Sequence, residues 1–168
     1  TTQSCTFTTL PNSTYSVTVK QVNGSVTSST STALTGVVID TARPTVVLTS
    51  SVLTNANSTQ TSAFTITATF SEAISGLLIG EITKDAASTG WTVGSSLTAS
   101  STSIYTFTAT NSSGTANTAG RLLLGIAEGV AADTAGNTNS ATVNNFVINT
   151  VATVTFSVTG TGATGGTA

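Results

Sequence analysis

A strand–joint–strand pattern occurs twice in this chain, and its repetition restricts the possible folds more than any other feature. Residues 37–49 read VVIDTARPTVVLT, and residues 146–156 read FVINTVATVTF. In both copies a run of β-branched and apolar residues is followed by a short polar joint and a second apolar run. A segment that recurs after roughly a hundred residues is typical of a tandem array whose period is one module.

The two joints divide the chain into three expected segments. Residues 1–42 would hold the C-terminal strands of a preceding module and its joint, residues 43–150 a complete module, and residues 151–168 the first strand of a following module with a Gly/Thr-rich tail. Pro44 suits a semi-rigid joint, because proline fixes φ, removes a backbone donor and pushes the preceding residue toward extended geometry.

Alternation of apolar residues with threonine predicts an all-β module. The strongest signal is residues 64–70, where every second residue is apolar. Further strands are expected at residues 46–49, 77–79, 91–93, 105–109, 122–126 and 143–148, which gives about seven short strands, as in an antiparallel β-sandwich. Only residues 80–87 leave room for a turn of helix. The expected inward residues are Val47, Phe64, Ile66, Ala68, Phe70, Leu78, Trp91, Tyr105, Phe107, Leu124, Ile126 and Phe146.

Charged residues make up only 6% of the chain, the net charge is −2, and histidine is absent. Without a basic face, we expect no nucleic-acid partner and no attraction to anionic lipid. Without histidine, imidazole-dependent catalysis and the usual zinc sites are excluded. No apolar run approaches the ~20 residues of a membrane helix, so no membrane insertion is expected. These absences predict a protein that is not an enzyme.

Serine and threonine together exceed a third of the residues, so solubility must depend on hydroxyls or on attached sugars. Asn12, Asn23, Asn57 and Asn111 each begin an Asn-x-Ser/Thr pattern and are candidate N-glycosylation sites. In a chain this rich in hydroxyl residues, such matches also arise by chance. Cys5 is the only cysteine, and either it forms an intermolecular disulfide or it is a small buried hydrophobe.

Three segments resemble motifs of the bacterial Ig-like (Big) tandem repeat family, and they occur in the family's order. Residues 39–46 (IDTARPTV) resemble the "IDTTAPTV" joint, residues 70–77 (FSEAISGL) the "FSEPVTGL" segment, and residues 129–137 (GVAADTAGN) the "GVATDAAGN" turn. The second joint departs from the pattern, with Asn149 in place of aspartate and no proline. The resemblance implies an Ig-like sandwich that serves as a spacer or assembly unit in large extracellular or cell-surface proteins.

The few acidic residues of the module invite a metal hypothesis. Asp40 in the joint, Glu72 after the second strand, and Asp133 with Asn137 in the last hairpin are expected to meet at one pole. Calcium takes about six to eight oxygen ligands from such groups, and the resemblance implies calcium because some repeats of the family hold it at the joint. In the alternative interpretation, Asp133 and Asn137 only satisfy the backbone of a turn, and Glu72 caps a loop.

Three classes of function follow from these observations. The favoured one is a structural module of a filament, sheath or adhesin stalk, whose partners are neighbouring copies or modules of the same protein. The alternative is an adhesin module that binds a glycan or protein ligand through its loops, which an exposed aromatic cluster would favour. An enzyme would need converging carboxylates, such as Glu72 with Glu81 or Glu128 as a glycosidase pair, and nothing else supports this. The apolar strand pattern at residues 154–158 needs a cover, either from the same protein or by strand exchange with a neighbouring chain.

Overall fold

The computed structural model describes residues 4–7, 9–51, 63–111 and 120–148. In this part of the chain the fold is all-β, and every strand pair is antiparallel. The expected class, an all-β antiparallel sandwich, is confirmed. The expected strand and tail at residues 151–168 lie outside the described residues.

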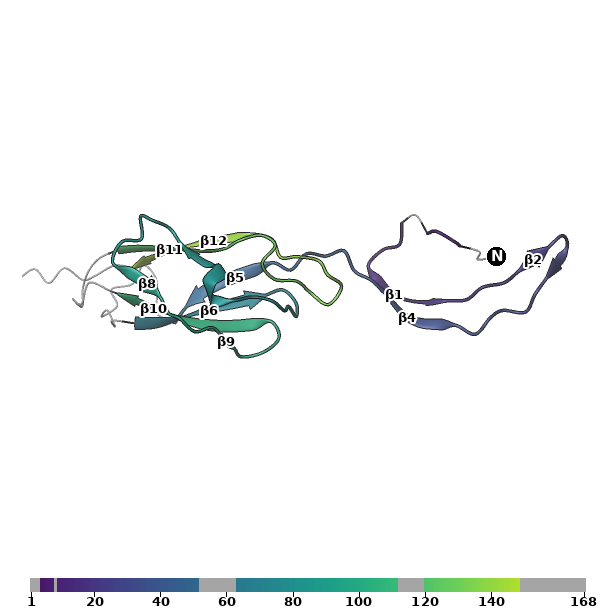
Figure 1. Ribbon diagram of the computed structural model, residues 1–168, viewed down its shortest axis with the longest axis horizontal. Helices are drawn as coiled ribbons and strands as arrows, with labels where there is room; N and C mark the ends of the chain where they lie inside the picture. Colours follow the sequence, from purple (N-terminus) through teal and green to yellow (C-terminus); the bar gives the residue numbers. More distant parts are fainter. Residues whose placement is uncertain (1–3, 8, 52–62, 112–119, 149–168) are drawn as a thin grey trace, which may run out of the picture.

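The N-terminal part is a long two-stranded ribbon. Strand β1 (Ser13–Val17) pairs with β4 (Leu34–Ile39), and β2 (Val22–Asn23) pairs with β3 (Val26–Thr27). Gly24 has a φ of +59°, a conformation that glycine adopts at little cost, so Asn-Gly suits the tight turn between β2 and β3. Figure 1 shows this ribbon extending beyond the rest of the molecule, to which the joint connects it.

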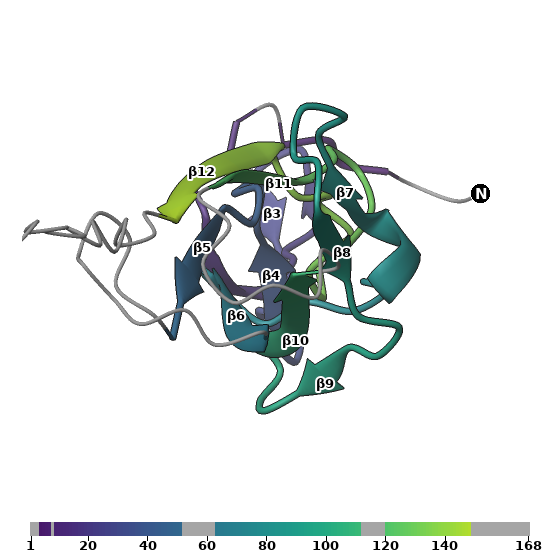
Figure 2. The same ribbon diagram turned by 90° about the vertical axis from the view of Figure 1, so that its left-hand side faces the viewer.

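The remaining strands form two sheets that face each other. The first sheet has the order β5 (Val46–Ser50), β6 (Ala63–Phe70), β10 (Ile104–Asn111), β8 (Trp91–Val93), and β9 (Thr98–Ala99) also pairs with β10. The second has the order β12 (Thr142–Ile148), β11 (Gly120–Ile126), β7 (Ile82–Lys84), and a 3₁₀ turn η1 (Ile79–Glu81) precedes β7. Viewed end-on in Figure 2, β11 and β12 form one layer, and β6 and β10 form the other.

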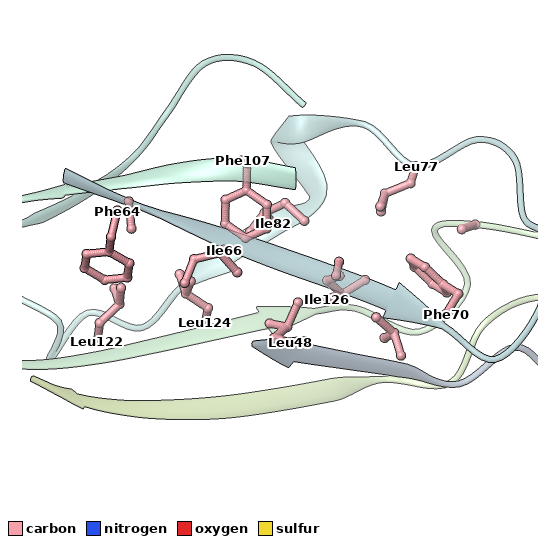
Figure 3. Close-up of a cluster of buried hydrophobic side chains, with 14 of the residues drawn as sticks. Leu48, Phe64, Ile66, Phe70, Leu77, Ile82, Phe107, Leu122, Leu124 and Ile126 are labelled. Carbon is pink, nitrogen blue, oxygen red and sulfur yellow. The ribbon is translucent and has the colours of Figure 1, made fainter. Parts of the chain in front are cut away.

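One apolar core fills the space between the two sheets. In Figure 3, Phe64 and Ile66 of β6 meet Leu122 and Leu124 of β11. The expected inward residues confirmed as buried are Phe64, Ile66, Ala68, Phe70, Trp91, Phe107, Leu124 and Ile126, while Tyr105 is partly buried against them. Two edge-to-face ring pairs, Phe64–Trp91 and Phe70–Tyr105, have centroids 5.4 and 6.0 Å apart and add specific geometry to the packing.

The expected burial is wrong for two residues. Val47 is 58% exposed and Leu78 is 66% exposed, whereas Val46, Leu48 and Leu77 are buried. In a strand successive side chains alternate between the two faces, so an error of one residue in register moves every side chain to the opposite face. Val47 lies in an unbroken apolar run, which carries no alternation to set the face, whereas Leu78 lies outside the strands, immediately before η1. The side chain of Phe146 lies outside the described residues.

The expected strand at residues 77–79 is also wrong. This segment leads into η1, and the strand of this region is β7, which starts at Ile82. The Oε2 atom of Glu81 accepts a hydrogen bond from the backbone N–H of Leu78 at 2.7 Å, which stabilises the turn in place of an extended chain. The helical turn expected within residues 80–87 is present only as η1, which ends at Glu81, because β7 begins at Ile82.

Candidate functional site at the joint

The predicted meeting of acidic residues is present at the joint. Asp40 follows β4, Glu72 follows β6, and Asp133 lies in the loop between β11 and β12. One carboxylate oxygen from each of these three residues lies within 4.8 Å of the others. The antiparallel topology places the end of β6 and the β11–β12 loop at the pole where the chain enters the sandwich, so residues distant in sequence gather there.

The loop around Asp133 is closed by its own side chain. The Oδ1 atom of Asp133 accepts the N–H groups of Ala135 and Asn137 at 2.8 and 2.9 Å, and Oδ2 accepts the Nδ2 of Asn137 at 2.9 Å. Gly136 has a φ of +94°, which a side chain would oppose. These bonds, with the Asn137 side chain first, lower the pKa of Asp133 below its ordinary value although burial opposes them. The turn interpretation therefore accounts for the contacts of Asp133.

Asn137 connects this loop to the joint. Its Nδ2 also donates to the backbone carbonyl oxygen of Asp40 at 3.0 Å. Since Nδ2 donates to two oxygens, the amide of Asn137 acts here as a hydrogen-bond donor. These contacts give no support to the expectation that Asn137 is a metal ligand.

Glu72 is the carboxylate of the cluster whose ionised form is disfavoured. Its side chain is half-buried, and within the described residues no hydrogen bond or basic group contacts its carboxylate. Burial first, and then the charges of Asp133 and Asp40, raise the pKa of Glu72 above its ordinary value. The site thus places negative charge on Glu72 at a cost that a proton or a bound cation would relieve.

Arg43 fastens the joint to the sandwich. Its Nε donates to the carbonyl oxygen of Thr138 at 2.8 Å, and Nη2 donates to that of Asn139 at 2.9 Å and pairs with Glu128 at 2.6 Å. Asn139 is fully buried and bonds the backbone of residues 127, 131 and 140, so Arg43 bonds a loop that is itself held by buried hydrogen bonds. Sequence reasoning missed this role, and its signal was that Arg43 is one of only four basic residues.

Asn12 fastens the joint to the N-terminal ribbon. Its Oδ1 accepts the backbone N–H and the hydroxyl of Thr41 at 3.2 and 2.9 Å, and its Nδ2 donates to the Oδ1 of Asp40 at 3.3 Å. The Oδ1 of Asp40 also accepts the N–H of Ala42 at 3.0 Å. The sequence identified Asn12 only as a glycosylation candidate, whereas its amide side chain bonds the joint.

The other modification candidates lie apart from the joint. Asn23 is exposed in the β2–β3 hairpin, and Asn57 lies outside the described residues. Asn111 is only 8% exposed, which argues against a glycan on the folded module. Cys5 is exposed and free, so its interpretation as a buried hydrophobe is wrong, and the intermolecular disulfide stays a prediction.

The inner face of the ribbon is apolar and open. It borders a hollow of about 730 Å³, whose apolar lining includes Phe7, Leu10, Tyr15, Val17, Val37 and Ile39. The two strands β11 and β12 of the sandwich are likewise paired, but their inner face is covered by the opposite sheet. In the described part of the chain, no second sheet covers β1 and β4.

Glu81 and Glu128 do not join Glu72 in a carboxylate pair. Glu81 bonds the backbone of η1, and Glu128 pairs with Arg43. The described aromatic side chains of the sandwich pack in or against the core, so they form no exposed cluster of the kind a ligand-binding module would use. Within the described residues, no helix is long and apolar enough to cross a membrane. Comparisons with protein-family models, curated proteins and solved structures give no match.

Proposed function

We propose that this chain is a structural module of an extracellular filament, sheath or adhesin stalk, built from tandem Ig-like repeats and acting as a spacer and assembly unit. The observation that carries the proposal is the joint, which is bonded to the structure on both of its sides. Asn12 bonds it to the ribbon, and Arg43 and Asn137 bond it to the sandwich. The three motif resemblances and the recurrence of the joint support the same function.

In this function the joint transmits orientation rather than acting as a hinge. A typical hydrogen bond contributes a net ~0.5–1.5 kcal/mol, so several bonds at one short joint favour a single relative orientation of its neighbours. The apolar inner face of the ribbon supports a neighbouring module or copy as partner, because an exposed apolar face of this kind is normally covered. No catalytic step belongs to this function.

Stiffness at the joint is tested by small-angle X-ray scattering of the whole chain. We expect one extended conformation for the wild type and a broader distribution of dimensions for Asn12→Ala, which cuts the bonds to Thr41. Asn23→Ala changes the same residue type in an exposed hairpin and serves as the matched control. If the ribbon and the sandwich reorient freely in the wild type, the spacer function is contradicted.

The extracellular location is tested separately with an antibody against the sandwich. We expect gold-labelled antibody to bind intact producing cells, with label along filaments or a surface layer in electron micrographs. Label that appears only after the cells are permeabilised would exclude an extracellular filament, sheath or stalk.

We further propose that the acidic cluster binds calcium and thereby stiffens the joint. The donor set fits in part: Glu72 offers a carboxylate that forms no hydrogen bond with the described residues, and Asp40 offers its Oδ2. Asp133 would have to share oxygens that already accept hydrogen bonds. Calcium needs about six to eight oxygens, so water would complete the shell, which predicts a weak site.

Thermal denaturation with calcium or with chelator tests this proposal. At a calcium concentration 100-fold above Kd, stabilisation of about 2.7 kcal/mol is expected. Glu72→Gln should abolish the effect, and Glu81→Gln, which changes a glutamate outside the cluster, should leave it in place. A melting temperature that responds to neither calcium nor chelator would remove calcium from the function while leaving the spacer proposal intact.

A further inference from the structure

The outer face of the five-stranded sheet is an array of threonines, here called the threonine face. Its members are Thr49, Thr65, Thr67, Thr69, Thr92, Thr98, Thr106, Thr108 and Thr110. All of them are exposed or half-buried. Those on β5, β6, β8 and β10 alternate with core residues of the same strands, and Thr98 on β9 lies opposite Thr106. In Figure 2 the outer side of β6 and β10 faces away from β11 and β12.

The strand register aligns these threonines into rows across the sheet. One row crosses four strands, since Thr67 lies opposite both Thr49 and Thr106, and Thr106 lies opposite Thr98. A second row pairs Thr65 with Thr108. Residues directly opposite on antiparallel strands share a face, so each row presents hydroxyl and methyl groups at the spacing of the strands.

The threonine face carries no charge. The charged side chains that the structure describes lie elsewhere: at the joint (Asp40, Arg43, Glu72, Glu128, Asp133), around β7 (Glu81, Lys84, Asp85) and on the ribbon (Lys20). Charged side chains on a sheet surface normally keep molecules apart. Their absence from a regular sheet face permits close approach by a neutral partner.

We propose that the threonine face docks against the same face of a second copy of this chain. A threonine hydroxyl both donates and accepts hydrogen bonds, so two such faces are chemically self-complementary, whereas two carboxylate faces would repel. Val47, which is 58% exposed, and the half-buried Ile104 lie opposite Thr69 and add apolar area. Two twisted sheets pack face to face at about 30°, so the twist of this sheet is compatible with such a pairing.

The hydroxyls keep capacity for such contacts. Thr92 and Thr106 donate to the carbonyl oxygens of Thr110 and Thr98 at 3.3 and 3.5 Å, which leaves their oxygens as acceptors. A charged ligand would find no counter-charge on this face. A sugar would find no exposed aromatic ring there, because Trp91, Tyr105 and Phe107 of the same sheet point to the core.

The size of the face predicts a weak pairing. Strands lie about 4.8 Å apart, and residues on one face of a strand lie about 6.6 Å apart, so each outward residue covers about 32 Å². The threonine face with Val47 and Ile104 therefore covers roughly 350 Å². Both copies together bury roughly 700 Å², below the ~1,200 Å² of stable complexes. The pairing does not depend on the proposed function, but an array of modules would strengthen it through multivalency.

Sedimentation velocity tests the pairing between about 10 µM and about 1 mM, where contacts of this size associate. The background is Cys5→Ser, which prevents disulfide dimers of the exposed thiol. Thr65→Lys places a charge on the exposed centre of β6, and Thr49→Lys does so on β5. Thr27→Lys makes the same change on the ribbon and is the matched control.

We expect reversible dimers of the background protein, weakened at least tenfold by Thr65→Lys and by Thr49→Lys and unchanged by Thr27→Lys. Circular dichroism of each variant confirms that it is folded. Because two face variants are used, the test still holds if one of them fails to fold. A monomer throughout the concentration range overturns the proposal. Dimers that survive both face variants also overturn it and place the contact elsewhere, such as the apolar hollow of the ribbon.

Discussion

The Nδ2 of Asn137 donates to the backbone carbonyl oxygen of Asp40 at 3.0 Å, although 97 positions separate the two residues in the chain. The same nitrogen donates to Asp133 at 2.9 Å, so one amide links the end of the ribbon to the last loop of the sandwich. The entry of the chain into the module is therefore defined by side-chain contacts as well as by the covalent backbone.

Asn137→Ala should lower the free energy of unfolding by about 1–3 kcal/mol, because it leaves partly buried acceptors without their donor. Urea denaturation measures the loss. Thr134→Ala, at an exposed position of the same loop, is the control and should have little effect. Equal stability of Asn137→Ala and the wild type would show that water replaces the amide at no cost.

Arg43→Lys should destabilise the module more than Glu128→Ala. A lysine cannot reproduce the two directed bonds of the guanidinium to the carbonyls of Thr138 and Asn139. The ion pair with Glu128 is largely exposed and should contribute less than about 1 kcal/mol. Thermal denaturation of both variants gives the order, and the reverse order would assign the role of Arg43 to the ion pair.

Phe107→Ala should cost about 3–5 kcal/mol, because it empties part of the core beside Ile66. Val47→Ala should cost less than about 1 kcal/mol, since that side chain is 58% exposed. Chemical denaturation of the two variants tests the register of β5 and β10 together. A larger loss for Val47→Ala would mean that β5 turns its other face to the core.

Glu72→Gln should raise the melting temperature at neutral pH. The pKa of Glu72 is raised in the folded state, so the folded protein binds more protons than the unfolded chain between the ordinary value of 4.5 and the raised one. Stability contributed by this group therefore increases as pH falls through that window. The advantage of Glu72→Gln should shrink over the same window, and parallel pH profiles for variant and wild type would contradict the cause.

Asp133 contributes a pH dependence of stability that is opposite in sign to that of Glu72. Its pKa is lowered in the folded state, so its contribution is present above the ordinary value of 3.8 and is lost as pH falls through the lowered value. Asp133→Asn should therefore reduce stability at neutral pH and remove part of the acid-induced loss. A pH series of thermal melts shows both effects, and acid denaturation identical to that of the wild type would contradict them.

Where alternation is strong, the strands and their faces could be predicted from the sequence. Strands β6 and β10 have an apolar residue at every second position, and both bury the predicted side. The meeting of Asp40, Glu72 and Asp133 was also predictable, because strand ends in an antiparallel module gather at its poles. These features depend on local period and on topology, which the sequence expresses directly.

Other features were decided only by the tertiary structure. The face of β5 follows from its pairing with β6, since the continuous apolar run of residues 46–48 allows either face. The roles of Asn12 and Arg43 depend on backbone groups that lie 29 and 95 positions away in sequence. A backbone carbonyl or N–H is the same at every residue, so no residue type marks it as a partner. The sequence by itself therefore determined the all-β class and most of the core, while contacts to distant backbone groups, which only the folded chain brings together, decided how the joint is held.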